Sequence, residues 1–439
     1  MKIKNLQNKK ICILGYGIEN QALVKFLIKK KIKADITICD AREDTRCSIG
    51  HRVSWRLGKN YDKNLSQFHI IFRIAGYPLF SPEIKKAIKA GVEISSPTKL
   101  FFSLCPSKNI IGVTGTKGKG TTATLIYKIL KQHVGTHRGA FPQNVFIGGN
   151  IGIPMFSFLD KIKKNDWVIL ELSSFQLEDV AVSPKIAVIT NFSREHLKSA
   201  DPNNPNYHKT MTDYWKAKSN IFKHQVKSDY LIINDKLKVK KINIESSIKY
   251  FTKSELPSKL VGDYNKENIA AAVEVAKLAG VKMDTIKKVV SNFKNLENRL
   301  EYVKTIKEVK YYNNSFATTP DATIADLKSF TEPIILLAGG ADKGADFKKL
   351  AKHIYKKAKF VILFKGKSSP RIKKKLLKIK YQKNKIKIVS SMKEAVKIAC
   401  QNSVPGDVVL LSTACASFGL FKNYKHRGML FKDEVQRLK

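Results

Sequence analysis

Residues 109–122, NIIGVTGTKGKGTT, have the pattern of a buried strand, a glycine-punctuated loop and the first turn of a helix. The apolar run at 109–113 predicts the strand, and the following TTATLIYKILKQ has helical periodicity. Such a loop turns backbone N–H groups toward one point and places Lys119 to reach a terminal phosphate. The stretch therefore predicts a nucleotide-binding loop, with a ligand-free strand-to-helix turn as the alternative.

The loop departs from the usual phosphate-loop pattern at one position. Gly120 follows Lys119, where a Ser or Thr normally supplies a hydroxyl to the metal. The metal-facing hydroxyl is then expected from Thr121, from Thr122 or from neither.

Composition limits the class of protein. The 439 residues include 81 Lys and Arg against 36 Asp and Glu, a formal net charge of +45. Such a charge often marks proteins that bind nucleic acid or anionic membranes. Here the basic residues are mostly lysines spread over polar helix faces, with few aromatics between them. We interpret the excess as a solvated surface that also attracts anionic substrates, and we expect no nucleic-acid partner.

The sequence carries no sign of secretion or membrane insertion. MKIKNLQNKK passes directly into the strand ICILG, without a signal peptide, and no run approaches about 18 apolar residues. We expect a cytoplasmic monomer of two or three domains. Neither a zinc site nor a disulfide framework is indicated, because no C-x-x-C pair occurs among Cys12, Cys39, Cys47, Cys105, Cys400 and Cys415.

Strands and helices alternate through residues 10–104, which predicts a parallel sheet with helical crossovers. Gly15, Tyr16 and Gly17 follow the first strand, and Asp40 ends the second. Only two of the three glycines of a dinucleotide-binding fingerprint are present. A Rossmann-like domain that holds a nucleotide diphosphate is one interpretation, and a strand-to-helix turn without a ligand is the other.

Residues 105–297 carry most of the polar side chains that follow predicted strands. Glu171 ends the strand in DWVILELSSFQLE, where a magnesium ligand beside a phosphate loop is expected, although an ordinary strand-end acid fits the same pattern. His196 ends a similar segment. A helix predicted over 207–223 places Lys218 near Trp215 and Phe222 on one face, where apolar neighbours can lower the pKa of an amine. A surface lysine is the alternative.

Residues 298–439 predict a further alternating unit. Lys343, Ser412 and Ser417 follow its strands, at the edge where ligands of open α/β sheets gather. The expected fold class is therefore α/β throughout.

Taken together, these motifs resemble the ATP-dependent Mur ligases. Residues from 112 to 428 contain, in the family's order, GVTGTKGKGTT, GGNIG, ELSSFQLE, TNFSREH, YWKAKSNIF, GDYNKENIAAA, NRLE, NNSFATTPDAT, LLAGGADKGADF and LLSTACASFGLFKNYKHRG. ELSSFQLE and the ACASFG segment are most similar to the members that join D-glutamate to UDP-N-acetylmuramoyl-L-alanine in peptidoglycan precursor synthesis.

The resemblance implies three domains: a Rossmann-like one over 1–104 for the uridine nucleotide, a central P-loop ATPase over 105–297, and a C-terminal Rossmann-like domain over 298–439. It also implies ATP, two Mg²⁺ ions and a CO₂-derived carbamate on Lys218. Catalytic roles fall to Lys119, His196 and Lys218, and metal binding to Thr121, Glu171, His196 and Lys218.

The resemblance assigns the remaining residues to ligands. ATP would contact Gly115, Thr116, Lys117, Gly118, Lys119, Gly120, Thr121, Thr122, Asn268, Arg299 and Asn314. The uridine nucleotide would contact Gly15, Tyr16, Gly17, Ile18, Asp40 and Arg42, the acyl group Asn150, Ser173 and Gln176, and the incoming amino acid Thr318, Lys343 and Ser417, with Tyr424 also at the substrate.

Two further positions differ from the family pattern. Asn314 stands where an aspartate commonly contacts the ribose, and Phe316 stands where many members carry a lysine beside the acyl and amino-acid site. Alternatives therefore stay open: a Mur or folylpolyglutamate-type ligase for another amino acid, a nucleic-acid-binding P-loop ATPase, or a non-catalytic homologue.

Overall fold

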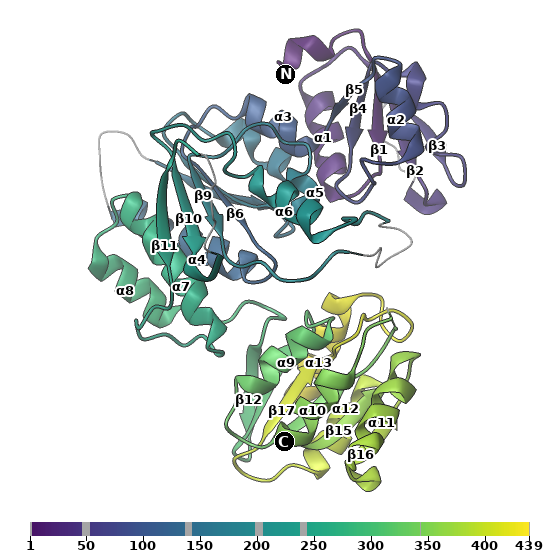
Figure 1. Cartoon of the computed structure of the whole chain (residues 1–439), viewed down its shortest axis with the longest axis vertical. Helices are drawn as coiled ribbons and strands as arrows, with labels where there is room; N and C mark the ends of the chain where they lie inside the picture. The colour runs from purple at the N-terminus through teal and green to yellow at the C-terminus, as the bar shows by residue number, and fades with distance from the viewer. Residues whose placement is uncertain are drawn as a thin grey trace. The chain divides into compact units, whose positions relative to one another are not determined.

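Three α/β domains follow one another along the chain (Figure 1). The computed structural model describes residues 2–45, 53–136, 143–197, 205–237, 244–342 and 344–438. By internal contacts the chain divides into two compact units, Met1–Leu256 with Glu267–Val290, and Pro257–Lys266 with Ser291–Lys439. The first unit holds the first two sheets and the second unit holds the third. No helix in the described ranges is both long and apolar enough to cross a bilayer.

The first domain is a five-stranded parallel sheet in the order β3-β2-β1-β4-β5. Two of its helices begin with a serine cap followed by proline, a sequence that fixes the helix start. Its elements are β1 (Lys10–Leu14), α1 (Ile18–Lys29), β2 (Asp35–Asp40), β3 (Val53–Leu57), β4 (Ile70–Arg73), α2 (Pro82–Lys89), β5 (Glu93–Ser95) and α3 (Pro97–Leu104).

The second domain has a six-stranded parallel sheet in the order β11-β10-β9-β6-β8-β7. Its central strand β6 is buried along its whole length, as its unbroken apolar sequence requires. The elements are β6 (Ile110–Thr114), α4 (Lys119–Thr136), β7 (Val145–Gly149), β8 (Trp167–Glu171), α5 (Ser174–Leu177), β9 (Ile186–Ile189), α6 (Met211–Ser219), β10 (Tyr230–Asn234), β11 (Ser247–Phe251), α7 (Tyr264–Leu278) and α8 (Met283–Asn292).

A single hydrophobic core runs beneath both of these sheets. It joins Leu23 of α1 and Phe101 of α3 to Leu170 of β8 and Ile189 of β9. Phe156, in a 3₁₀ turn between β7 and β8, contacts the rings of Phe26 and Phe101 at centroid distances of 5.0 and 6.3 Å. The first two domains are therefore packed as one body.

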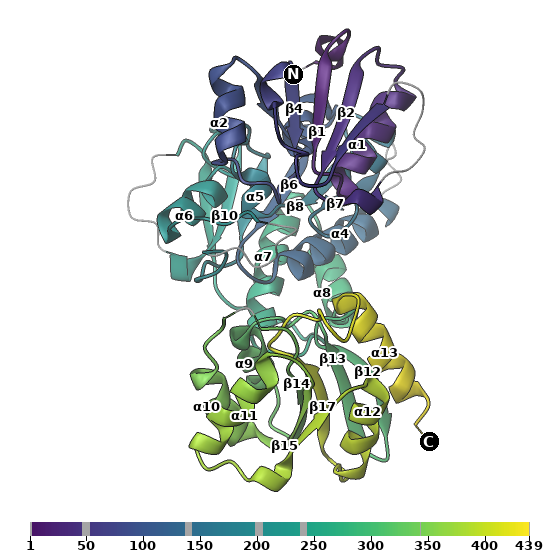
Figure 2. The same cartoon turned by 90° about the vertical axis from the view of Figure 1, so that its right-hand side faces the viewer.

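The third domain has a six-stranded sheet in the order β12-β13-β17-β14-β15-β16, with α9, α10 and α11 on one face and α12 and α13 on the other (Figure 2). Among the strands in the described residues of this domain, β12 alone runs antiparallel to its neighbour. The elements are β12 (Glu301–Ile306), β13 (Val309–Asn314), α9 (Pro320–Lys328), β14 (Ile334–Ala338), α10 (Lys348–Lys357), β15 (Ala358–Phe364), α11 (Ser368–Lys378), β16 (Ile386–Val389), α12 (Met392–Gln401), β17 (Val408–Ser412) and α13 (Tyr424–Gln436).

The predicted α/β class is confirmed, with parallel sheets in the first two domains and a mixed sheet in the third. The helix predicted over 207–223 is wrong in extent, since α6 spans only Met211–Ser219. Thr210 and Asp213 form a reciprocal capping box that starts the helix at that point. Phe222 consequently lies beyond the helix rather than on the same helical face as Lys218.

Candidate active site

The glycine-rich loop joins β6 to α4, and two of its glycines are required by their surroundings. Gly115 and Gly118 have φ of +147° and +81°, where side chains are strained. A Cβ at Gly115 would lie 2.0 Å from Thr190 Oγ1, and one at Gly118 would lie 2.1 Å from Asn268 Oδ1. The loop is thus packed tightly between β9 and α7.

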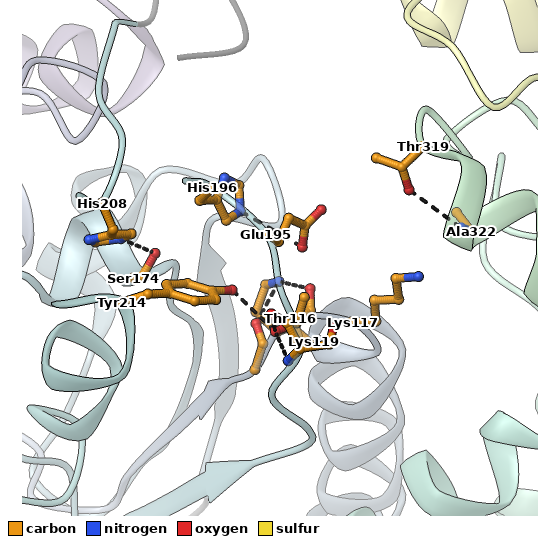
Figure 3. Close-up of polar contacts among 12 residues, drawn as sticks. Thr116, Lys117, Lys119, Ser174, Glu195, His196, His208, Tyr214, Thr319 and Ala322 are labelled. Carbon is orange, nitrogen blue, oxygen red and sulfur yellow. Dashed lines mark hydrogen bonds and ion pairs between the residues drawn. The ribbon is translucent and has the colours of Figure 1, made fainter. Parts of the chain in front are cut away.

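Lys119 is the first residue of α4, and its side chain turns back toward the loop (Figure 3). Its Nζ donates to the carbonyl oxygens of Gly115 and Thr116, each at 3.0 Å. The loop is held from the other side by Thr190 and Asn191, which together make three hydrogen bonds with the backbone of Lys117. The structure therefore presents a braced phosphate loop with its lysine at the helix N-terminus, where an anion is favoured.

Because Gly120 has no hydroxyl, the hydroxyl expected to face a metal would come from Thr121 or Thr122, and the structure distinguishes between these two residues. Thr122 Oγ1 donates to Asn268 Oδ1 at 3.3 Å and is fully buried. Thr121 is buried as well, and in the described residues the hydrogen bond to Asn268 Oδ1 comes from Thr122 and not from the Thr121 hydroxyl. Of the two, Thr121 better fits a metal-facing role, which stays a prediction.

Glu171 ends β8 beside the loop, with only 2% of its surface exposed. Its Oε1 accepts a hydrogen bond from Asn150 Nδ2 at 3.0 Å. Its Oε2 is buried and has no hydrogen-bond partner among the residues that the structure describes. A buried carboxylate oxygen of this kind is costly unless it is paired, so Glu171 fits a cation better than it fits an ordinary strand end.

Lys218 lies on α6 and is 1% exposed, which rules out the alternative of a surface lysine. Its Nζ donates to Gly115 O at 2.8 Å and to Thr114 Oγ1 at 3.4 Å, so the amine sits directly behind the phosphate loop. Burial and the nearby charge of Lys119 lower the pKa of Lys218 well below its ordinary value. The amine is therefore suited to be neutral.

His196 lies in a left-handed turn with φ of +59°, and its side chain is partly exposed. Beneath it is a buried aromatic layer in which His208 stacks on Phe175 at 4.7 Å and Tyr214 lies 5.7 Å from the His196 ring. The Tyr214 hydroxyl points to Thr116 Oγ1 at 3.2 Å (Figure 3). The histidine and the phosphate loop are thus joined through one packed cluster.

His208 is the buried histidine of this cluster. Its Nε2 is 2.9 Å from Ser174 Oγ, and its backbone N–H donates to His196 O at 2.8 Å. Burial, with the charges of His196 and Lys218, lowers the pKa of His208 to about 4. A neutral imidazole therefore supports the turn that carries His196.

A cavity of about 360 Å³ lies between the first two domains, which form one compact unit. Asp40 accepts from the backbone N–H of Tyr16 at 2.6 Å and from Arg42 Nε at 3.0 Å; burial opposes the effect of the Arg42 hydrogen bonds, but the net pKa of Asp40 is lowered. The predicted residues that line the cavity are Gly15, Gly17, Ile18, Asp40, Arg42, Asn150 and Gln176.

Ser173 and Gln176 have a structural role that was not predicted, although their S-x-x-Q spacing is the signature of a capping box. Ser173 Oγ accepts from the Gln176 N–H at 3.2 Å, and Gln176 Oε1 accepts from the Ser173 N–H at 2.9 Å. This capping box starts α5. Gln176 still borders the cavity, whereas the Ser173 hydroxyl is used by the helix, and their substrate roles stay predictions.

The other predicted site residues belong to the second unit. Asn314 Nδ2 donates to Asp326 Oδ2 at 2.8 Å, and Ser412 Oγ donates to the same oxygen at 2.6 Å. An aspartate at position 314 would bring two buried carboxylates together, which accounts for an amide here. Ser417 is buried and Thr318 partly so. Lys343 lies outside the described residues.

Three domain models match this chain in sequence order. They are described as Mur ligase MurD-like, N-terminal domain (residues 9–96), Mur ligase middle domain (113–254) and Mur ligase, glutamate ligase domain (298–415). A Clostridium tetani relative called UDP-N-acetylmuramoylalanine--D-glutamate ligase is 38% identical, covering 99% of this chain and 98% of the relative. The chain belongs to the Mur ligase family.

Other relatives agree with this assignment. An Acetivibrio thermocellus protein of the same name is 36% identical to this Mur ligase over 99% of the chain and 98% of the relative. The structure of MurF ligase from Thermotoga maritima, in complex with ADP, superposes with a TM-score of 0.58 at 16% identity, covering 99% of this chain and 97% of that one. MurF from Acinetobacter baumannii gives 0.59 at 14% identity, covering 100% and 93%. At these identities the structural matches support the fold alone.

This Mur ligase is an ATP-dependent ligase by family. Several residues that shape its site were missed by sequence reasoning. Thr190 and Asn191 brace the loop, His208 underlies His196, and Glu19 borders the cavity. Thr190 and Asn191 open the TNFSREH motif, but the motif does not show what they contact. The roles of all four residues depend on partners at distant positions in the chain.

Proposed function

We propose that this Mur ligase joins D-glutamate to UDP-N-acetylmuramoyl-L-alanine, with conversion of ATP to ADP and phosphate, in cytoplasmic peptidoglycan precursor synthesis. The observation that carries the proposal is full-length similarity to relatives of that name, at 36–38% identity. The site supports it: a buried carboxylate and a buried amine lie next to the phosphate loop, and Asn150, which donates to the Glu171 carboxylate, also lines the 360 Å³ cavity.

The reaction needs an activated carboxyl group. The L-alanine carboxylate attacks the γ-phosphorus and ADP leaves, so that an acyl phosphate forms; the amine of D-glutamate then attacks the carbonyl carbon and phosphate leaves. Both steps gather negative charge on oxygen. We propose that Lys119 and the N–H groups at the start of α4 stabilise this charge; loss of one such preorganised donor costs roughly 3–4 kcal/mol in other enzymes.

Mg²⁺ fits the donors present at the loop. The unpartnered Oε2 of Glu171 is a hard oxygen ligand in a buried position beside the phosphates' expected place. We propose that Glu171, with the Thr121 hydroxyl, holds one ion, and that His196 and Lys218 hold a second. When bound, such ions offset charge on the transferring phosphoryl group.

Lys218 would contribute to the second ion as a carbamate. A neutral amine and CO₂ give a carbamate and a proton, and the buried, cation-flanked Lys218 meets the requirement for neutrality. The product would supply the carboxylate that the second metal position otherwise lacks.

Release of ADP tests the proposed function. We expect phosphate and ADP to appear only when UDP-N-acetylmuramoyl-L-alanine, D-glutamate, ATP and Mg²⁺ are all present. A panel of amino acids is the necessary comparison, because Phe316 occupies a position near the expected amino-acid site. Turnover with another amino acid and none with D-glutamate would overturn the assignment while leaving the ligase chemistry intact.

A further inference from the structure

Phe316 is an exposed aromatic residue held between two side chains of the third domain. Its residue surface is 40% exposed. The Arg299 guanidinium carbon lies 3.8 Å from the centroid of its ring, and the Tyr424 ring meets it nearly perpendicularly, at 5.1 Å and 84°. All three residues belong to the second unit, so this stack is complete without the rest of the chain.

The backbone around Arg299 is held in an uncommon conformation. Asn298 and Leu300, on either side of Arg299, have φ of +59° and +52°, a region that non-glycine residues rarely adopt. Hydrogen bonds fix the turn: Asn313 Nδ2 donates to Asn298 Oδ1 at 3.0 Å, and the Phe316 N–H donates to Asn298 O at 3.1 Å. Strain of this kind persists where the surroundings impose it, often at ligand sites.

The charge on Arg299 is not neutralised by its neighbours. The acids on either side in sequence, Glu297 and Glu301, both pair with Lys432, at 2.6 and 3.3 Å. No hydrogen bond or ion pair joins the Arg299 guanidinium to another residue in the described ranges of the chain. An aromatic ring accepts no hydrogen bond of a carboxylate kind from a guanidinium, so a guanidinium held over a ring still has N–H groups to donate to an anion.

We propose that Phe316 is a positioning residue that holds the Arg299 guanidinium in place for the phosphates of the nucleotide, with Tyr424 supporting the ring. The inference rests on the proposed role of Arg299 in binding ATP, whose phosphates are the anionic ligand. Arg299 on a flexible turn would lose side-chain freedom on binding phosphate; on the ring, much of that freedom is already lost. Cation–π contacts at exposed sites correspond to roughly 2- to 5-fold in an equilibrium constant.

ADP affinity, measured by titration calorimetry on the full chain, tests whether Phe316 holds Arg299 in place. Phe316→Leu keeps an apolar side chain but removes the aromatic face, and we expect it to weaken ADP binding roughly 2- to 5-fold. Phe316→Tyr should bind as the original chain does. Tyr355→Ala is the matched control, because Tyr355 is an aromatic of the same unit that is 54% exposed, and it should leave ADP affinity unchanged.

A double-mutant cycle separates positioning from a general structural effect. In an Arg299→Gln background, Phe316→Leu should cause no further loss of ADP affinity, because the Phe316 ring then has no guanidinium to hold. An equal loss in both backgrounds would overturn the proposal, as would full affinity in Phe316→Leu alone. Thermal midpoints of each variant show whether it is folded. Absence of D-glutamate-dependent ADP release in the original chain would refute the proposed function but not this coupling.

Discussion

Glu19 is a carboxyl group in a place that disfavours its charge. It borders the cavity, its Oε2 accepts from the Met155 N–H at 3.3 Å, and its Oε1 is buried with no hydrogen-bond partner in the described part of the chain. Burial raises the pKa of Glu19 to about 7 from 4.5, despite the Met155 hydrogen bond. At neutral pH a large fraction of this residue is therefore the neutral acid.

The raised pKa of Glu19 predicts a specific dependence of stability on pH. Between pH 4.5 and 7 the folded chain binds more protons at this site than the unfolded chain, so this contribution to stability decreases as the pH rises. Glu19→Gln removes the dependence. We expect the variant to gain stability relative to the original chain by on the order of 1–3 kcal/mol from acid to neutral pH.

Urea unfolding at a series of pH values measures the Glu19 effect. The quantity to follow is the difference in free energy of unfolding between Glu19→Gln and the original chain, since other titrating groups cancel in it. A difference that stays constant with pH would show that the pKa of Glu19 is the same in the folded and unfolded chains, which would contradict the raised pKa.

Lys218 gives the second prediction for a single residue. Lys218→Ala removes the amine that would become a carbamate, and we expect turnover to fall by roughly 100-fold or more, as for loss of other preorganised groups. Acetate or formate should restore part of the activity by supplying a carboxylate to the same space. Lys218→Arg is the control, since arginine keeps a cation but cannot form the carbamate; unchanged turnover in either variant would exclude the role.

The close packing of the phosphate loop predicts that a side chain added at Gly118 lowers both stability and ADP affinity. Gly118→Ala places a Cβ 2.1 Å from Asn268 Oδ1 at a φ of +81°. We expect a loss of about 1–2 kcal/mol in stability from the left-handed conformation alone, together with weaker ADP binding because the loop must move away from α7. Calorimetry and thermal unfolding of the same variant measure both effects.

Gly135→Ala is the matched control for the loop. Gly135 lies near the end of α4, where an added Cβ meets nothing within 4 Å, and alanine there should stabilise the helix by about 0.5–1 kcal/mol. If Gly118→Ala behaved in the same way, the close approach of the loop to Asn268 would have no energetic significance.

Elements were the part of this protein best anticipated from sequence. The run 109–122 predicts β6, its loop and α4, because strand burial and helix periodicity are local signals. The start of the helix predicted over 207–223 was not anticipated, since the capping box of Thr210 and Asp213 begins α6 at Met211. The antiparallel β12 was also missed, because pairing direction depends on a partner strand rather than on the strand's own residues.

The site residues were harder to predict from local sequence signals than the helices and strands were. Motif residues such as Lys119, Glu171 and Lys218 were identified through a family resemblance, and the structure places all three around one loop. The burial of Lys218 decides between two interpretations that periodicity alone left open. Glu19 and His208 were missed, because a raised or lowered pKa arises from surroundings contributed by other segments.

The whole molecule has a charge of +45, and this predicts two effects of salt with opposite signs. Added NaCl, up to about 0.5 M, screens repulsion among the lysines and should raise the thermal midpoint by a few degrees. The same screening should weaken binding of the anionic sugar nucleotide and raise its KM. A KM that did not change with salt would show that the general lysine excess takes no part in attracting substrate.

One hydrophobic core lies under the sheets of the first and second domains, and both domains line the 360 Å³ cavity. The walls of the cavity are therefore formed without a bound ligand. For inhibitor discovery this has a practical meaning. Fragment-sized molecules can be screened against the resting enzyme, and those that offer a hydrogen-bond acceptor to the neutral Glu19 should be favoured. Their potency should then decline as the assay is made more alkaline, a signature that identifies binders of this pocket without a crystal of each complex.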